Sequence, residues 1–284
     1  MKGPVVVGVD GSPDAARAVR WAAEQARRHG TELVALLAWS FLDQHHEVPG
    51  TPFDGGYDAE VAQRALQEYL RQALGEGAGG VVERVVCDLP VDALVDASET
   101  AGLVVVGRRG RGGFAGLRLG SVSERLLARS RGPVAVVGGD EGADDGPVAV
   151  AVDGSTTSAD ALRWALGEAR ARQVPLVVVH VWSEPWLAER LYEPDAPVFD
   201  RLQQAAEDVV ETLLREVDTT GLEVRREVLR GGAAARIVET AGDAALLVVG
   251  SRGLGAVAGA LFGSVSRQVV HHAPCTVVVV PPVV

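Results

Sequence analysis

The chain has 284 residues and a formal net charge of −11, with 47% hydrophobic, 23% charged and 5% aromatic residues. This is the composition of a globular protein with a substantial core, and its acidic balance disfavours nucleic-acid binding. Because Lys2 is the sole lysine, the lysine-dependent P-loop NTPases, protein kinases and pyridoxal enzymes are excluded. No apolar run approaches the roughly 18 residues of a membrane span, and the N-terminus does not resemble a signal peptide, so we expect a cytoplasmic protein.

Strand and helix patterns alternate along the first half of the chain. The apolar run Val5–Val9 is typical of a strand covered on both faces. The sequence Ser12-Pro13-Asp14 combines an N-cap serine, a proline at the first helical position and an acid in the first turn, and so predicts a helix start. The remaining expected elements are, in chain order, strand Leu33–Trp39, a helix with apolar pairs between 61 and 74, strand Val81–Val86, helix Val91–Ala101, strand Leu103–Val106, a helix from Gly120, and strand Val134–Val137.

The second half repeats the first at a constant offset of 143 residues. Val9-Asp10-Gly11-Ser12 recurs as Val152-Asp153-Gly154-Ser155, and Gly120-Ser121-Val122-Ser123 recurs as Gly263-Ser264-Val265-Ser266. The repeat predicts one domain over residues 1–139, a glycine-rich acidic linker over 140–146 and a second domain over 147–284. Five strands alternating with four helices predict an α/β, Rossmann-like doubly wound unit, present twice, each with a parallel sheet and helices on both faces.

In open α/β sheets, ligands bind beyond the carboxyl ends of the strands, where two loops of each unit carry distinctive residues. One loop begins at Asp10 or Asp153. The other has the spacing G-x2-G-x9-G-S, from Gly107 to Ser121 and from Gly250 to Ser264. Glycines let the backbone approach a ligand, and a helix that starts at Gly-Ser offers free N–H groups to a phosphate.

This spacing, after a valine-rich strand and with an aspartate closing the first strand, resembles the ATP-binding signature of the universal stress protein family. The run Ala273–Val280 is similar to the family's last strand, and both halves fit, so the chain resembles a tandem member. The resemblance implies the strand order 3-2-1-4-5 in each unit. It also implies an ATP-binding stress-response or regulatory protein, not an enzyme, in which the nucleotide sets the conformation or the choice of an unknown protein partner.

The resemblance further implies which residues hold the nucleotide, with Mg²⁺ as an optional companion of the triphosphate. Asp10 and Asp153, with the main chain near Ala38 and Val181, would hold adenine and ribose. The residues expected to cradle ribose and phosphates are Gly107, Gly110, Gly120, Ser121, Val122 and Ser123 in the first copy, and Gly250, Gly253, Gly263, Ser264, Val265 and Ser266 in the second.

Arginines distinguish the two copies. The glycine-motif loop of the first copy carries Arg108, Arg109, Arg111 and Arg118, whereas the same loop of the second copy carries Arg252 alone. Because guanidinium groups suit phosphate oxygens, Arg109 and Arg252 join the candidate ligand residues, and we expect the first site to hold a triphosphate more tightly. The alternative is that these arginines are solvated or face a partner.

Each assignment has a simpler competitor. Asp10 could bind only the N–H groups of its own turn, and Ser121 could serve only as a helix N-cap. The motif Gly110-x-Gly112-x-x-Ala115 matches a loose dinucleotide fingerprint, but it follows the fourth strand of its unit and not the first. His180 lies within a strand, where a satisfied core histidine is expected. The alternatives for function are a slow ATP hydrolase or other nucleotide-using enzyme, and a nucleotide-free scaffold.

The order 3-2-1-4-5 leaves the last strands, Val134–Val137 and Val277–Val280, at sheet edges. The resemblance implies that last strands pair between units, giving an intrachain pseudo-dimer, and a further homodimer is expected. The loops 40–57 and 183–200 differ most between the copies. The aromatic residues of the second loop, which either cover the nucleotide, dock a partner or pack locally, are Trp186, Tyr192 and Phe199.

Overall fold

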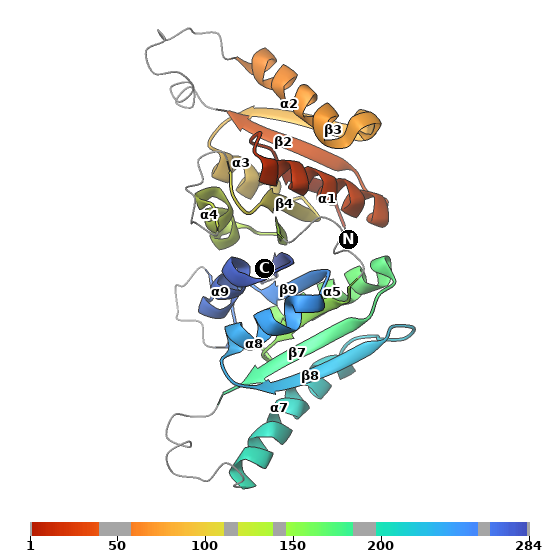
Figure 1. The fold of residues 1–284 in the computed structure, drawn as a ribbon, viewed down its shortest axis with the longest axis vertical. Coiled ribbons are helices and arrows are strands. Elements are labelled where there is room, and N and C mark those ends of the chain that lie inside the picture. Colours follow the sequence, from red (N-terminus) through yellow and green to blue (C-terminus); the bar gives the residue numbers. More distant parts are fainter. Residues whose placement is uncertain are drawn as a thin grey trace. The chain divides into compact units, whose positions relative to one another are not determined.

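The computed structural model describes residues 2–39, 58–110, 119–138, 146–183, 197–254 and 262–282. The chain separates into two compact units, Met1–Val137 (unit 1) and Gly138–Val284 (unit 2), and each has the same alternation of strands and helices (Figure 1). The predicted linker over 140–146 lies almost wholly outside the described residues and stays a prediction.

Unit 1 contains a five-stranded parallel sheet in the order β3-β2-β1-β4-β5, as the family resemblance implied. The first strand is central: Val5 pairs with Leu33 on one side and with Leu103 on the other. The elements are β1 (Val5–Gly8), α1 (Pro13–His29), β2 (Leu33–Trp39), α2 (Ala59–Leu74), a 3-10 helix (Gly75–Gly80), β3 (Val81–Cys87), α3 (Pro90–Ala97), β4 (Leu103–Gly107), α4 (Ser121–Arg129) and β5 (Val134–Val137).

Unit 2 repeats this topology with the order β8-β7-β6-β9-β10, again with every described pairing parallel. Its elements are β6 (Val148–Val152), α5 (Thr156–Arg172), β7 (Leu176–Trp182), α7 (Pro197–Arg215), β8 (Val224–Arg230), α8 (Ala233–Thr240), a 3-10 helix (Ala241–Asp243), β9 (Leu246–Gly250), α9 (Ser264–His272) and β10 (Thr276–Val280). The prediction of two doubly wound α/β units is therefore confirmed.

The central strands form the core because helices cover both faces of each sheet. Val5, Val7 and Leu103 have no exposed surface, which is why these strands read as unbroken apolar runs. On one face α1 contacts α2, and on the other α3 contacts α4. Burial of this kind holds the ends of the strands, and the described residues directly after them, in place.

Capping chemistry sets where the longest helices begin and end. The Ser12 hydroxyl accepts a hydrogen bond from Ala15 N at 3.1 Å, and α1 ends at Gly30 in the left-handed conformation, with φ of 59°. In unit 2, Ser155 caps α5 in the same way, but a glutamine, Gln173, takes the left-handed position. The predicted helix Val91–Ala101 is shorter than expected, because α3 ends at Ala97.

Candidate nucleotide site

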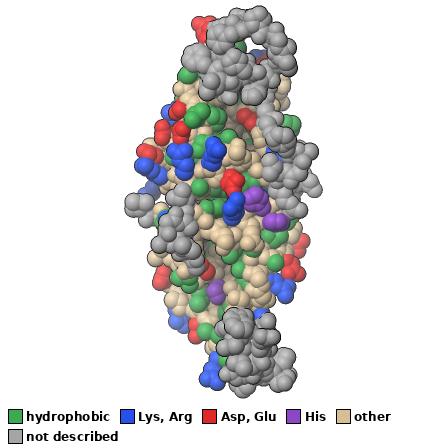
Figure 2. All heavy atoms as spheres, turned by 90° about the vertical axis from the view of Figure 1, so that its left-hand side faces the viewer, with side chains coloured by type: hydrophobic (Ala, Val, Ile, Leu, Met, Phe, Trp, Pro, Cys, Tyr) green, Lys and Arg blue, Asp and Glu red, His purple; other side chains and the backbone are tan. Residues whose placement is uncertain are grey.

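The loops after the first and fourth strands of each unit lie side by side. In unit 1, β1 and β4 are neighbours, with Val7 paired to Val105, so both chains leave the sheet at the same edge. In unit 2, β6 and β9 are neighbours in the same way. Figure 2 faces the edge toward which the strands of Figure 1 run, and acidic, arginine and apolar side chains are intermixed on it.

An aspartate carboxylate packs against the second glycine of the motif in both units. Asp10 Oδ1 accepts a hydrogen bond from Ser12 N at 3.0 Å, while Oδ2 lies where a Cβ on Gly110 would be. Asp153 does the same: Oδ1 accepts from Ser155 N at 3.0 Å, and Oδ2 lies where a Cβ on Gly253 would be. Each aspartate therefore binds the N–H groups of its own turn, as the simpler alternative expected. It also contacts the loop after the fourth strand of its unit, which carries the glycine motif and is called the second loop below.

Asp153 is held further by the loop after β9. Its Oδ2 accepts a hydrogen bond from Leu254 N at 2.8 Å, a contact between residues that are 101 positions apart. Burial is the largest single influence on this carboxyl and raises its pKa, but the hydrogen bonds from Ser155, Leu254 and Ser158 outweigh burial, so the pKa is lowered. The group is therefore a stable carboxylate that is ready to accept hydrogen bonds.

The first glycine of the motif permits a close approach of the first helix to the end of the fourth strand. A Cβ on Gly107 would lie 2.7 Å from the main-chain carbonyl carbon of Asp14, which leaves no room for a side chain. In unit 2, a Cβ on Gly250 would lie 3.0 Å from Thr157 Cγ2. The two glycines bring the N-terminus of α1 or α5 against the second loop.

The third glycine begins the helix that was expected to face phosphates. Gly120 N donates to Arg108 O at 2.7 Å and Gly263 N donates to Ser251 O at 2.8 Å, which closes the loop in both units. Gly120 and Gly263 are the N-cap residues of α4 and α9, and neither has a side chain to cap the first turn. The alternative in which Ser121 serves as the N-cap is therefore wrong, because Ser121 occupies the first helical position and is exposed.

The two serines of the Gly-Ser-Val-Ser sequence differ in their surroundings. Ser121 and Ser264 are exposed, whereas the later serines are buried. Ser123 Oγ donates to Gly107 O at 2.9 Å, and Ser266 Oγ donates to Gly250 O at 2.6 Å. The later serines fasten the helix to the strand end, and their predicted contact with a ligand stays a prediction. Val122 is half-buried and Val265 is exposed.

The predicted adenine-side positions lie at the same edge of the sheet. Ala38 and Val181, both half-buried, occupy the carboxyl ends of β2 and β7. Val152 pairs with His180, so Val181 follows at the level of Asp153. His180 is buried and its Nδ1 lies 2.8 Å from Val152 O, which confirms the satisfied core histidine.

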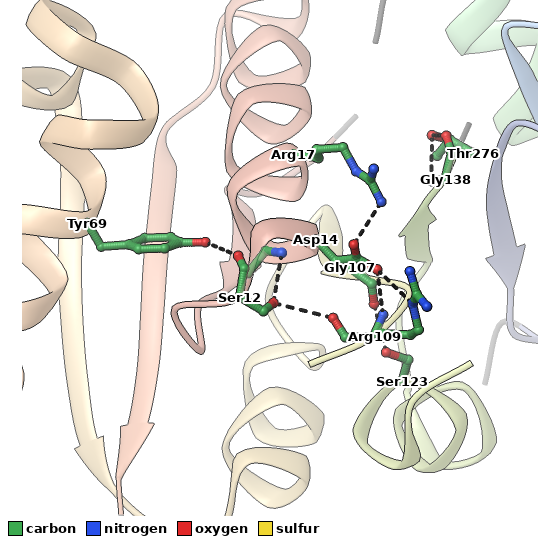
Figure 3. A network of polar contacts seen from close by, with 10 residues as sticks. Ser12, Asp14, Arg17, Tyr69, Gly107, Arg109, Ser123, Gly138 and Thr276 are labelled. Carbon is green, nitrogen blue, oxygen red and sulfur yellow. Dashed lines mark hydrogen bonds and ion pairs between the residues drawn. The ribbon is translucent and has the colours of Figure 1, made fainter. Parts of the chain in front are cut away.

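Unit 1 carries a polar network that the sequence did not reveal (Figure 3). Asp14 Oδ2 accepts a hydrogen bond from Arg109 N at 3.0 Å and lies 3.6 Å from Arg109 Nε, and Asp14 Oδ1 pairs with Arg17 Nη2 at 2.8 Å. Ser12 Oγ donates to Arg109 O at 3.3 Å, and Tyr69 Oη donates to Ser12 O at 2.5 Å. The sequence identifies Asp14 only as a first-turn acid of α1, and no sequence pattern connects α2 with Ser12.

Unit 2 has an aromatic cluster at the ends of β7 and β8. Trp182 Nε1 donates to Gln203 Oε1 at 2.7 Å, and the Arg230 guanidinium carbon lies 4.7 Å from the Phe199 ring centroid and 5.9 Å from that of Trp182. Phe199 is buried, which favours local packing among its alternatives. Trp186 and Tyr192 lie outside the described residues, as do Arg111 and Arg118 of unit 1.

Arg109 and Arg252 are both exposed at the start of the second loop.

Among the described residues, none of the helices has the length and apolarity needed to cross a membrane. Within the same residues, no three His, Cys, Asp or Glu side chains are grouped so that they could hold a metal ion.

Comparison with known proteins follows the internal repeat. The sequence profile of the universal stress protein family matches residues 1–138 and again 146–281. A universal stress protein of Mycolicibacterium smegmatis is 34% identical over 301 residues, covering 98% of this chain and 97% of its own length. Universal stress protein Rv2623 of Mycobacterium tuberculosis is 34% identical over 288 residues, covering 97% of this chain and 95% of its own length.

Solved structures show the same fold across the whole chain. A universal stress protein from Archaeoglobus fulgidus superposes with a TM-score of 0.65 at 23% identity, covering 99% of this chain and 97% of the other. One from Pseudomonas aeruginosa, described as a putative universal stress protein, gives a TM-score of 0.68 at 17% identity, covering 100% and 94%. The chain therefore belongs to the universal stress protein family, and each of its two halves matches that family separately.

Proposed function

We propose that the protein binds ATP at both pairs of loops and acts as a cytoplasmic stress-response or regulatory protein, without catalysing a reaction. The bound nucleotide would set the conformation of the protein or its choice of protein partner. The observation that carries the proposal is the packing of an aspartate carboxylate on a motif glycine, made by Asp10 on Gly110 and by Asp153 on Gly253. Both loops of the ATP-binding signature thereby meet at one place in each unit.

The carboxylate side of the site suits the nucleoside. Asp10 and Asp153 are acceptors at the carboxyl edge of the sheet, where ribose hydroxyls or an adenine amino group can donate to them. The main chain near Ala38 and Val181 lies at the same edge and offers N–H and C=O groups to the base. Asp153 is ionised well below neutral pH, because its pKa is lowered, so it is an acceptor in the physiological range.

The glycine side of the site suits phosphates. The first turns of α4 and α9 present N–H groups with no capping side chain at Gly120 and Gly263, and the helix dipole favours an anion there. Ser121 and Ser264 are exposed beside them and can donate to phosphate oxygens. The guanidinium groups of Arg109 and Arg252 supply positive charge. Mg²⁺, when bound with ATP, would offset phosphate charge.

A matched pair of glycine variants tests the proposal. Gly110→Val and Gly253→Val each place a side chain where the aspartate carboxylate lies, and neither glycine has positive φ, so the substitution adds no backbone strain. Calorimetric titration with ATP, on protein freed of any nucleotide carried through purification, should find two sites per wild-type chain and one in each variant. The variant Gly77→Val, at an open position of a 3-10 helix remote from the motif, is the control and should retain both sites. A wild-type chain that takes up no ATP would overturn the proposal.

A further inference from the structure

The acid that holds the second loop of unit 1 has no acidic counterpart in unit 2. Asp14 is buried, with 8% of its surface exposed, and its carboxylate contacts both the main chain and the side chain of Arg109. At the repeat offset, Asp14 corresponds to Thr157, Arg17 to Asp160, and Arg109 to Arg252. The arginine is thus common to both units, whereas the carboxylate that anchors it belongs to unit 1.

We propose that Asp14 is a positioning residue that orients Arg109 toward the phosphates of a nucleoside triphosphate, so that unit 1 discriminates for the polyphosphate more strongly than unit 2. This inference rests on the proposed nucleotide binding and deepens it. It assigns to each unit a different ligand preference, and it assigns the difference to one side chain outside the glycine motif.

The geometry leaves the outer edge of the guanidinium group for a ligand. Asp14 Oδ2 accepts a hydrogen bond from the main-chain N of Arg109 at 3.0 Å and lies 3.6 Å from Arg109 Nε. The Arg109 side chain is nevertheless 47% exposed. The Nη atoms, which form the outer edge of the fork, can then meet a phosphate in bidentate fashion. An arginine already restrained loses less side-chain freedom when it binds, which strengthens the interaction.

The negative charge of Asp14 does not cancel the positive charge that a phosphate would meet. Its other oxygen, Oδ1, pairs with Arg17 Nη2 at 2.8 Å, and Arg17 lies three residues further along α1. The trio of Arg17, Asp14 and Arg109 therefore keeps one net positive charge (Figure 3). In unit 2 the residue at the position of Arg17 is Asp160, which pairs with Arg163 at 2.7 Å, so this pair and Arg252 together also carry one net positive charge. The two units therefore differ in the carboxylate that anchors the arginine and not in this net charge.

The loop of unit 1 is also braced from the other side. Ser12 Oγ donates to Arg109 O, and Tyr69 Oη donates to Ser12 O. Asp14 and Ser12 thus hold the main-chain N–H and C=O of the same residue, Arg109. In unit 2 the residue at the position of Tyr69 is Thr212, which is too short to serve as an equivalent brace. In unit 2, Leu254 N donates to Asp153 and fastens the loop after β9, whereas the residue at the position of Leu254 in unit 1, Arg111, lies outside the described residues.

The test compares ATP with adenosine, which lacks phosphates, at unit 1 of the full chain. Gly253→Val removes the unit 2 site and serves as the parent; Asp14→Thr, Arg109→Ala and the double variant are made in it. We expect Asp14→Thr to weaken ATP binding roughly fivefold to tenfold and to change adenosine binding by less than about twofold. In the Arg109→Ala background, Asp14→Thr should weaken ATP binding much less, because the contact with the arginine side chain is already gone and only the hydrogen bond from the main-chain N of residue 109 remains to be lost.

Asp14→Asn supplies a second variant should the threonine variant fold poorly. It keeps an acceptor for Arg109 N but loses the charge, so an intermediate loss of ATP affinity is expected. If Asp14→Thr weakened ATP and adenosine binding equally, its role would be merely structural and the inference would be overturned. The same would follow if Asp14→Thr weakened ATP binding as much in the Arg109→Ala background as in the parent. Unchanged or tighter ATP binding by Asp14→Thr would also overturn it. Failure of the parent to bind ATP and adenosine would instead remove the proposed function, and the inference with it.

Discussion

At the scale of single residues, Asp10 and Asp153 join two loops in their own units, and unit 1 adds the carboxylate of Asp14. Asp10 and Asp153 both accept from the N–H two residues later, at 3.0 Å. The family resemblance, which implies that β1 and β4 are sheet neighbours, could predict that these aspartates meet the glycine motif. It could not predict the Asp14–Arg109 contact, which depends on where the N-terminus of α1 lies relative to a loop 95 positions away.

The lowered pKa of Asp153 predicts a pH effect on stability. A carboxyl whose pKa is lower in the folded state stabilises the protein above its unfolded value, about 3.9, and this stabilisation is lost as pH falls through the folded pKa. The wild type should therefore lose its stability advantage over Asp153→Asn as pH falls from about 5 toward 3. Urea unfolding of both proteins at several pH values measures this. An advantage that grows as pH falls would contradict the assignment.

The two serines of the first Gly-Ser-Val-Ser sequence should separate stability from binding. Ser123→Ala removes the donor to Gly107 O at 2.9 Å in a buried position, so the free energy of unfolding should fall by about 1–2 kcal/mol. Ser121→Ala, at an exposed position, should change it by less than about 0.5 kcal/mol while weakening ATP binding. Chemical denaturation and ATP titration of both variants provide the readouts; equal destabilisation by the two would refute the division of roles.

At the scale of elements, the sequence predicted what local patterning controls. Buried parallel strands appear as apolar runs, and α1 and α5 begin where Ser12 and Ser155 predicted, because the capping groups are close in sequence. The 3-10 helix Gly75–Gly80 carries no apolar periodicity and was missed. The early end of α3 at Ala97 reflects tertiary packing, since the Ser98 hydroxyl binds Val95 O and Arg131 N.

The C-termini of α1 and α5 offer a reciprocal test of left-handed backbone strain. Gly30 and Gln173 occupy equivalent positions with φ of 59°, and a Cβ on Gly30 would meet nothing within 4 Å. Gly30→Gln should lower the free energy of unfolding by about 1 kcal/mol, and Gln173→Gly should raise it by a similar amount. Thermal or urea unfolding of the two variants measures both changes. Effects of the same sign would show that side-chain contacts, not backbone strain, dominate at these ends.

At the scale of the whole molecule, the chain carries the same site twice with different surroundings. Among the described contacts, the loop after the fourth strand is braced through Asp14 and Tyr69 in unit 1 and through Asp153 in unit 2. Unit 2 also places Arg230 over Phe199 and Trp182 beside the strand ends. If the proposed function holds, such a tandem chain binds two nucleotides with different preferences, which a symmetric dimer of single units cannot do. Pairing of the last strands between units and a further homodimer stay predictions. The molecular mass of the protein in solution tests the homodimer.

The nucleotide content of the purified protein tests the central claim most directly. The full chain, Gly110→Val, Gly253→Val and the double variant are purified without added nucleotide and denatured, and the released small molecules are identified and counted. We expect about two adenine nucleotides per wild-type chain, mainly intact ATP, one in each single variant and none in the double variant. Wild-type protein that releases no nucleotide and takes up no added ATP would contradict the account while leaving the fold unaffected.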